Sequence, residues 1–235
     1  CTGVLLITGI LDDYKELSSK NKLLIQLVLA LFLVIYGDFI VLQLGDIFDS
    51  GEPQGLGILA MPFTVIAIVA AINAFNMIDG HDGLSGSLSL ISLLSLAIIV
   101  VLRGEVADES RQIIIVLTVS VLIPFLFFNL HLFVNSSRQV FMGDAGSMFF
   151  GLLIAYYLID FSQRDIPLMS PSAVPWLIAL PILDMVSVIF TRIVSGLSPT
   201  QPDRTHLHHL LVRKGLSTIS VLLILLATQM MFTFV

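Results

Sequence analysis

The stretch NAFNMIDGHDGLSG, residues 73–86, closes an apolar run and predicts how the rest of the chain is arranged. It carries Asn73, Asn76, Asp79 and Asp82 at intervals of three, and side chains at that spacing lie close together on a helix surface. The glycines that follow favour a turn. Polar and ionisable groups at the end of a membrane helix are costly and usually carry function. The stretch therefore predicts a functional helix end, with simple capping of the next helix as the alternative.

The composition is that of a membrane protein. Of 235 residues, 57% are hydrophobic and only 12% are charged, and the mean hydropathy is +1.01. A soluble domain carries about 25% charged residues. Repeated apolar runs of about 20 residues predict an all-α, polytopic helical bundle in the membrane. The formal charge of −6 therefore belongs to particular loops, and the single cysteine, Cys1, excludes an internal disulfide.

We expect one integral membrane domain over residues 1–235, with about seven complete transmembrane helices after a truncated first one. Residues 2–11 are apolar but too few to cross a bilayer, so they predict the end of a helix whose beginning is missing. The chain also ends inside an apolar run, which predicts a fragment that is cut at both ends. The expected complete spans are 23–42, 57–78, 85–102, 112–132, 147–160, 174–195 and the helix from about 218.

The connecting loops predict the orientation in the membrane. If loops alternate across the bilayer, residues 12–22, 79–84, 133–146 and 196–217 share one side. That side holds seven basic residues: Lys15, Lys20, Lys22, Arg138, Arg204, Arg213 and Lys214. The opposite loops hold three: Arg103, Arg111 and Arg164. The positive-inside rule makes the first side cytoplasmic, and every unusual polar cluster of the chain lies there.

Two further acidic clusters lie on that side. Asp12 and Asp13 are adjacent where a helix leaves the membrane, and paired carboxylates favour a bound metal or one acid with a raised pKa. A solvated helix end is the alternative. Asp144 lies between glycines in FMGDAGS, residues 141–147, just before a helix whose N-terminus favours phosphate. A helix cap by Asp144 or Ser147 is the alternative there.

The last cytoplasmic loop carries Arg204, His206, His208 and His209. Dense histidine would suit zinc, but no cysteine lies nearby and the other candidate ligands are carboxylates. Hard oxygen ligands favour Mg²⁺, with Mn²⁺ as the alternative. An arginine beside three histidines suits a diphosphate, whereas a basic loop that only sets topology is the alternative interpretation.

Taken together, the clusters predict phosphoryl transfer at the membrane surface. Five aspartates converge on cationic Lys, Arg and His side chains, and a metal-bridged diphosphate satisfies both groups. One substrate should be a lipid, because a soluble reaction gains nothing from a site between membrane helices. The five aspartates are Asp12, Asp13, Asp79, Asp82 and Asp144.

At these residues the chain resembles the polyprenyl-phosphate N-acetylhexosamine-1-phosphate transferase family. The signatures are GILDDYKELS, NAFNMIDGHDGL, VFMGDAGS and PDRTHLHHLL, in the family's order and spread over nearly the whole chain. The PDRTHLHH form is similar to the branch that transfers N-acetylglucosamine-1-phosphate to undecaprenyl phosphate. The resemblance implies a UDP-sugar donor, release of UMP, a place in the bacterial inner membrane with a cytoplasmic site, and the start of cell-envelope glycan synthesis such as O-antigen of lipopolysaccharide. Nucleic acid is not an expected partner, and a homodimer is left open.

The resemblance also implies residue roles. It implies that Asp144 ligates Mg²⁺ with Asp12 and Asp13 beside it, one of that pair being the base for the lipid phosphate. It places Asp82, Asn129 and Phe141 near the uridine, with Phe141 stacking on the base. The phosphate contacts would come from Lys22, Arg204 and the histidines at 206, 208 and 209, while Asn76 and Asp79 shape the site.

The sequence departs from the family pattern at three points. His81 stands where the family usually has an aliphatic residue, and Glu16 replaces an Asp sometimes found after the Asp-Asp pair. The family's enzymes also have further helices before Cys1, so we expect part of the lipid groove to be missing from this chain.

Two other functions remain as alternatives. An ion-coupled secondary transporter would use intramembrane acids, and Asp184, within the span 174–195, fits that role unless it positions a neighbouring helix. An intramembrane aspartyl protease would leave the histidine loop unexplained.

Overall fold

The computed structural model describes residues 1–15, 17–103, 109–130, 139–199 and 205–234. Over these residues the chain is all-α, and its single β feature is an isolated antiparallel bridge between Gln43 and Gly55. Short 3₁₀ turns, η1 (Gly57–Leu59) and η4 (Pro171–Ala173), precede α3 and α7. The α-helices are α1 (Thr2–Lys15), α2 (Ser19–Tyr36), α3 (Ala60–Ile78), α4 (Leu84–Arg103), α5 (Glu109–Asn129), α6 (Gly143–Ser162), α7 (Val174–Leu177), α8 (Ala179–Val194), α9 (Leu207–Arg213) and α10 (Thr218–Thr233).

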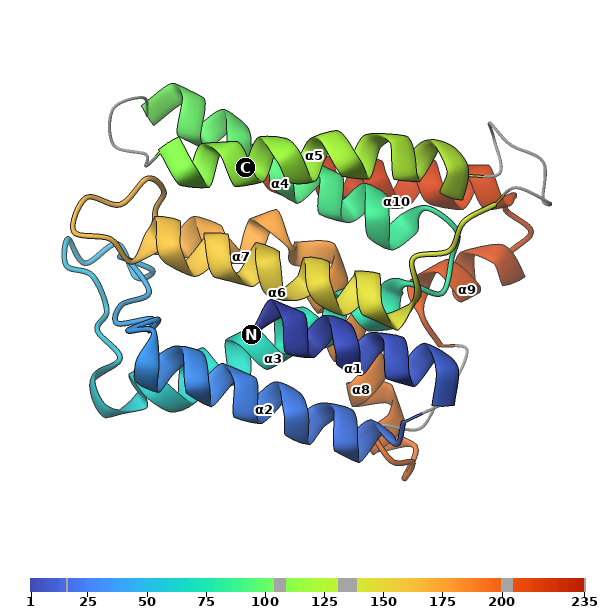
Figure 1. Ribbon diagram of the computed structural model, residues 1–235, viewed down its shortest axis with the longest axis horizontal. Helices are drawn as coiled ribbons and strands as arrows, with labels where there is room; N and C mark the ends of the chain where they lie inside the picture. The colour runs from blue at the N-terminus through green and yellow to red at the C-terminus, as the bar shows by residue number, and fades with distance from the viewer. Residues whose placement is uncertain (16, 104–108, 131–138, 200–204, 235) are drawn as a thin grey trace.

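The long apolar helices confirm a polytopic membrane bundle. Within the described residues, five segments are long and apolar enough to cross a bilayer: α2, η1 with α3, α4, α5 and α6. A sixth arises if α7 and α8 form one broken span, and α10 is apolar but only 16 residues long. The outer helices α2 and α5 bury little of their surface, as expected for helices that face lipid (Figure 1).

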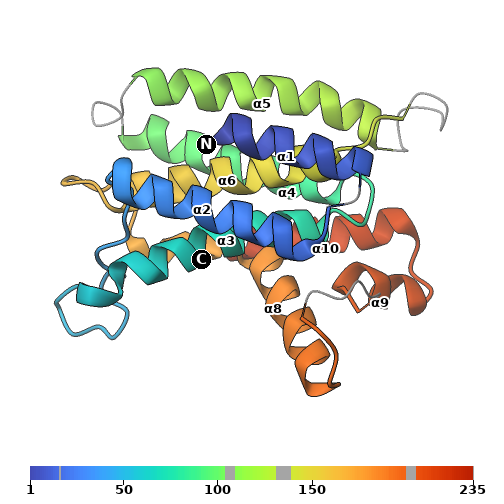
Figure 2. The same ribbon diagram turned by 60° about the horizontal axis from the view of Figure 1, so that its bottom comes forward.

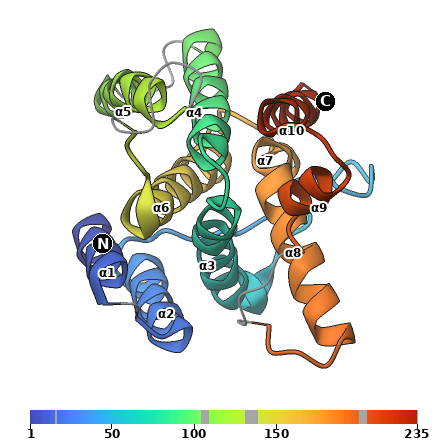
Figure 3. The same ribbon diagram turned by 90° about the vertical axis from the view of Figure 1, so that its right-hand side faces the viewer.

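Helix α6 is the centre of the bundle, with α1 and α3 packed closely against it (Figure 3). The close approach depends on small residues. A Cβ added to Gly9 of α1 would lie 2.2 Å from the Ala145 Cα of α6, and one added to Gly151 of α6 would lie 2.7 Å from the Ile72 Cα of α3. Small residues at helix contacts are how membrane helices bring their backbones together.

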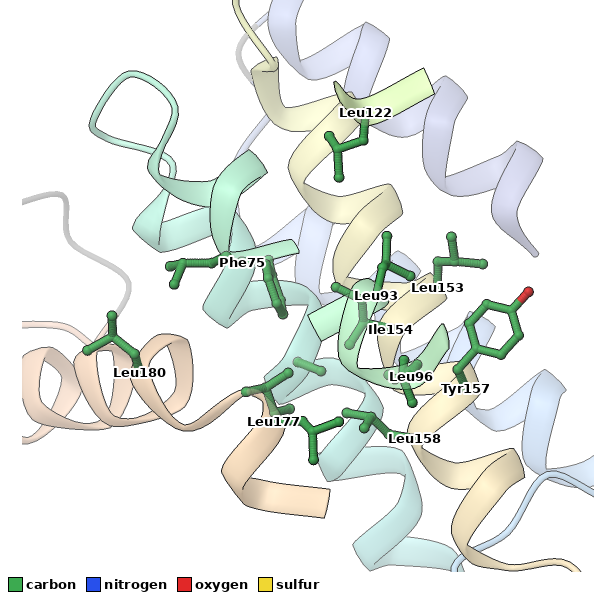
Figure 4. Packing of buried hydrophobic residues seen from close by; sticks show 14 of the residues in the cluster. Phe75, Leu93, Leu96, Leu122, Leu153, Ile154, Tyr157, Leu158, Leu177 and Leu180 are labelled. Atoms are coloured by element: carbon green, nitrogen blue, oxygen red, sulfur yellow. The ribbon is translucent and has the colours of Figure 1, made fainter. Parts of the chain in front are cut away.

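Two apolar clusters flank this contact. The larger joins α3, α4 and α6 to residues of α5, α7, α8 and α10, and it contains Phe75, Leu93, Ile154 and Leu177 (Figure 4). The smaller, which includes Leu5, packs α1 and α2 onto α3 and α6. Because α3 and α6 contribute to both clusters, the helix ends that carry the polar signatures are held in one rigid frame.

Several helix boundaries differ from those expected. The helix expected over 23–42 ends at Tyr36, since Gly37 caps it and Asp38 adopts a left-handed φ of 50°. Helix α1 continues to Lys15, so Asp12 and Asp13 lie in its last turn and not in a loop. The loop expected over 196–217 contains the short helix α9.

The span expected over 174–195 is not continuous. It breaks at Ile178 into α7 and α8, which meet at 74°. The backbone groups freed by the break find side-chain partners: Leu180 N donates to Gln229 Oε1 at 2.9 Å, Gln229 Nε2 donates to Trp176 O at 3.0 Å, and Ser92 Oγ donates to Leu177 O at 2.8 Å. Helix α8 consequently projects away from the other long helices (Figure 2).

Replacing Gln229 with Leu is expected to lower the thermal stability of the protein. The change leaves the buried Leu180 N and the partly buried Trp176 O without their side-chain partner, at a cost of about 1–3 kcal/mol for the buried group, so the melting temperature should fall by several degrees. The measurement is thermal unfolding in detergent. Thr228→Val is the control, because Thr228 is only half-buried and its hydroxyl donates to Ile224 O of its own helix in a solvent-exposed hydrogen bond. Equal melting temperatures for the two variants would contradict the expectation.

The polar signatures meet at one end of the bundle, as the topology argument predicted. The C-terminal ends of α1 and α3, the N-terminal ends of α2 and α6, and α9 all lie at the right in Figure 1. The connections 37–56 and 163–170 lie at the opposite end.

Candidate active site

Lys22 joins two of the predicted metal ligands. Its Nζ donates to Asp12 Oδ2 at 2.7 Å and to Asp144 Oδ2 at 2.8 Å. The three side chains come from α2, α1 and α6, so the contact ties the consecutive helices α1 and α2 to α6, which lies 122 residues further along the chain at Asp144. Asp12 is 8% exposed, and its Oδ1 also accepts from Leu17 N at 2.7 Å. The ammonium group of Lys22 therefore occupies a position where two carboxylates face each other.

The carboxylate of Asp13 makes different contacts from the carboxylate of Asp12. The Asp13 carboxylate accepts from the backbone N of Asp144 at 2.9 Å and of Ala145 at 3.4 Å, so it caps the N-terminus of α6 from outside that helix. Gly143 makes this possible, because it has a left-handed φ of 65° and an added Cβ would lie 2.7 Å from Asp13 Oδ2. The signatures GILDD and MGDAG thus form one structural unit.

A second layer of hydrogen bonds supports this unit. Asn76 Nδ2 donates to the fully buried Ser147 Oγ at 3.1 Å, which links the end of α3 to the first turn of α6. Deeper in the bundle, Asn73 of α3 donates to Gln26 of α2. Ser147 was considered only as a helix cap, and Gln26 was not predicted, since a polar residue in an apolar run was the only signal for it in the sequence.

An open cleft of about 350 Å³ lies beside the Lys22 contact. Six of the predicted site residues line this cleft, at the ends of α3, α5 and α6 and in the turns next to these ends. Asn129 is 4% exposed and donates to Val140 O at 2.7 Å, whereas the Phe141 ring is 69% exposed and available for stacking. The lining residues are Asn76, Asp79, Gly80, His81, Asp82, Gly83, Asn129, Phe141, Met142, Gly143 and Asp144.

The electrostatics of the cleft favour a bound cation. Burial, together with the nearby carboxylates of Asp144, Asp13 and Asp82, raises the pKa of Asp79 to about 8. Acids placed this close together disfavour one another's ionised form unless a cation joins them. Among the described residues, no three His, Cys, Asp or Glu side chains are arranged to hold a metal ion on their own. Mg²⁺ sites commonly use one or two carboxylates plus substrate phosphates, so the side chains present fit such an ion.

The histidine segment, defined as His206, His208 and His209, packs against the same end of the bundle. Asp184 of α8 accepts from His206 Nδ1 at 2.7 Å and from Leu207 N at 2.7 Å, which anchors the start of α9. His208 is 2% exposed, and its Nε2 lies 3.0 Å from where a Cβ on Gly80 would be. The segment reaches the back of the turn that lines the cleft, but none of its side chains lines the cleft itself.

His81 and His208 are neighbours, with ring centroids 6.0 Å apart. His81 Nδ1 lies 3.1 Å from Asp82 O, so this nitrogen carries the proton. His81 stands where an aliphatic residue was expected, and the structure places it between the Asp82 turn and the histidine segment. Arg204 and Glu16 lie outside the described residues.

Lowering the pH from 6.5 to 4 is expected to destabilise the wild type relative to His208→Phe. Burial, followed by the neighbouring His209 and His206, lowers the pKa of His208 from 6.5 to about 4. Between these values the unfolded chain binds a proton that the folded protein excludes, so stability is lost as the pH falls. Asp184 raises the His208 pKa and His81 lowers it further.

The measurement is the difference in melting temperature between the two proteins across that pH range. The difference is measured because the raised pKa of Asp79 increases stability as the pH falls, and this effect is present in both proteins and cancels. A difference that stays constant from pH 6.5 to 4 would contradict the depressed pKa of His208.

The fold and the site together define a class: a multi-pass membrane protein that has, at one end, an acidic cleft beside two carboxylates joined by a lysine. The sequence pattern of glycosyl transferase family 4 matches residues 1–162, and the chain belongs to that family.

Individual relatives are similar over nearly all of this chain. An undecaprenyl-phosphate alpha-N-acetylglucosaminyl 1-phosphate transferase of Escherichia coli strain K12 is 37% identical over 218 residues, which is 93% of this chain and 58% of the relative. The protein of the same name from Haemophilus influenzae is 39% identical over 215 residues, which is 92% of this chain and 59% of the relative. The chain thus spans less than two thirds of the length of these relatives.

Proposed function

We propose that the protein transfers N-acetylhexosamine-1-phosphate, with N-acetylglucosamine as the sugar, from a UDP-sugar to undecaprenyl phosphate. A phosphate oxygen of the lipid attacks the phosphorus that carries the sugar, and the bond from that phosphorus to the bridging oxygen of UMP breaks. UMP leaves, and the lipid becomes a diphosphate sugar. The site would lie on the cytoplasmic face of the bacterial inner membrane, where the positive-inside argument puts it.

The observation that carries this proposal is the bridge from Asp12 through Lys22 to Asp144, next to a cleft of about 350 Å³ at a helix N-terminus. A helix N-terminus and a lysine favour phosphate, and the facing carboxylates favour a divalent cation. The relatives' names state a sugar 1-phosphate transferase that acts on undecaprenyl phosphate, which agrees with this combination.

The proposed ion is Mg²⁺, with Mn²⁺ as the alternative. Asp144 and Asp12 would hold it, because their carboxylates already share one cationic group, the Lys22 ammonium. When bound, such an ion would spread the negative charge that builds on the diphosphate.

Several residues of the site then have roles that follow from their positions. Lys22 would contact phosphate after a substrate phosphate replaces one of its two carboxylate partners. Asp13 keeps the N-terminus of α6 in place through its cap, so Asp12 is the better placed of the pair to orient the lipid phosphate. Asn129, Phe141 and Asp82, which all line the cleft, would hold the uridine.

An ion-coupled transporter is less well supported than the transferase. Asp184 was the acid that fitted such a role, and its carboxylate is engaged with His206 and Leu207 N at the anchor of α9.

The test uses the full-length protein in membranes, supplied with undecaprenyl phosphate and UDP-N-acetylglucosamine. We expect UMP release that requires both the lipid and Mg²⁺, and a lipid diphosphate sugar as the second product. Absence of UMP release with any UDP-amino sugar, from folded protein, would exclude the transferase. Exchange of labelled UMP into the UDP-sugar without lipid would instead indicate a covalent phospho-sugar intermediate on an aspartate.

A further inference from the structure

We propose that Asp184 is a positioning residue for the histidine segment, and that it acts by setting the tautomer of His206. This proposal rests on the proposed function for its kinetic consequence, but its structural part can be tested without it. The position of Asp184, in the middle of an apolar segment, would otherwise be unexplained, because a buried acid needs partners.

The contact between Asp184 and His206 is short, buried and directional. Asp184 is 6% exposed and His206 is 7% exposed, and Asp184 Oδ2 lies 2.7 Å from His206 Nδ1. An ionised carboxylate can only accept, so Nδ1 carries a proton. In the neutral ring the lone pair is therefore on Nε2, and in the charged ring the carboxylate stabilises the positive charge.

The second carboxylate oxygen places the whole of α9. Asp184 Oδ1 accepts from Leu207 N at 2.7 Å, at the first residue of the helix. One side chain thus fixes both the ring of His206 and the start of the helix that carries the other two histidines. The His206 and His208 rings are nearly parallel, with centroids 5.7 Å apart, and His208 lies against Gly80. The contacts form a continuous path from Asp184 to the turn that lines the cleft.

The position of Asp184 depends in turn on the broken helix. Helix α8 lies beside α9 because it turns by 74° from α7 (Figure 3). Gln229 and Ser92 satisfy the backbone groups at that break, so α10 and α4 hold the direction of α8. A straight helix over 174–194 would leave Asp184 in another place relative to Leu207.

Asp184→Asn is the decisive variant, because it keeps the shape of the side chain at 184 and should reverse the tautomer of His206. The Asn oxygen can still accept from Leu207 N, while its NH₂ group can donate to Nδ1 and so move the ring proton to Nε2. With ¹⁵N-labelled histidine, the nitrogen shifts of His206 should show the proton on Nδ1 in the wild type and on Nε2 in the variant. The same tautomer in both proteins would overturn the proposal, whether or not the protein is a transferase.

The kinetic arm measures UMP release by the full-length protein. We expect Asp184→Asn to lower kcat by about tenfold or more, as losses of residues that orient a ligating or catalytic histidine do. Because Asp184 acts through His206, the double variant with His206→Asn should lose no more than His206→Asn alone. A double variant whose loss of kcat equals the product of the two single losses would overturn the proposal. A wild type that shows the expected tautomer but no UMP release would count against the proposed function only.

A matched control and a second variant separate positioning from general damage. Asp160→Asn removes an equally paired carboxylate at the other end of the bundle, where Asp160 bonds Arg111 and Arg164, and should leave kcat and the His206 tautomer unchanged. Asp184→Ala removes both contacts, so amide exchange in residues 207–213 should accelerate relative to Asp160→Asn. Unchanged exchange in α9 would show that Asp184 does not place this helix.

Discussion

Asp144→Asn is expected to lower the rate of UMP release by at least about 10²-fold to 10³-fold, the range found when one group that stabilises transition-state charge is removed. Asn keeps the size of the side chain but loses the charge that pairs with Lys22 and that would hold Mg²⁺. The backbone N of residue 144 can still donate to Asp13, so the capped turn and the fold should persist. The measurement is lipid-dependent UMP release at saturating Mg²⁺, with the melting temperature recorded alongside.

Asp160→Asn is the matched control, since Asp160 lies on the same helix, α6, and forms ion pairs with Arg111 and Arg164 far from the cleft. It should reduce stability without lowering the turnover rate. Comparable losses of activity in the two variants would mean that Asp144 matters through folding alone. Full activity of Asp144→Asn would remove this residue from the reaction.

Gly9→Ala is expected to destabilise the protein and to lower its activity, although Ala normally stabilises a helix by about 1 kcal/mol relative to Gly. The added Cβ would lie 2.2 Å from the Ala145 Cα and 2.5 Å from Ala145 N, both backbone atoms that cannot turn aside. Overpacking of this kind costs about 1–3 kcal/mol. Separation of α1 from α6 would also draw Asp13 away from the amides that it caps, so activity should fall together with stability.

Gly3→Ala is the control on the same helix. An added Cβ at Gly3 meets nothing within 4 Å, so this variant should be neutral or slightly stabilising and fully active. The comparison uses thermal unfolding and UMP release for both variants. If Gly9→Ala were as stable and active as Gly3→Ala, the close contact between α1 and α6 would be wrong.

The sequence predicted the features that depend on local pattern. Apolar runs of membrane length indicated the helices, and loop charges indicated that the polar signatures share one end of the bundle, as they do. The convergence of Asp12 and Asp144 was predicted, and the Lys22 contact brings them together. The family resemblance was confirmed by the match over residues 1–162. The roles of the site residues and the Mg²⁺ ion stay predictions.

Other features escaped the sequence because they depend on which helices become neighbours. Asp12 and Asp13 are adjacent and identical in type, yet one faces Lys22 and the other caps α6. Pro181, which has no N–H to donate to Leu177 O, marks a break near Ile178 in the sequence, but Gln229, which stabilises the break, lies some fifty residues away. Asp184 could be a transporter acid or a helix anchor until His206 and Leu207 were found beside it.

The sequence by itself determined an all-α membrane protein whose acidic and histidine signatures gather at one end, because hydropathy and charge act on each segment separately. Only the tertiary structure decided which carboxylates pair with Lys22, which one caps α6 and which one accepts from His206, because these contacts depend on the donors that packing brings within hydrogen-bond distance.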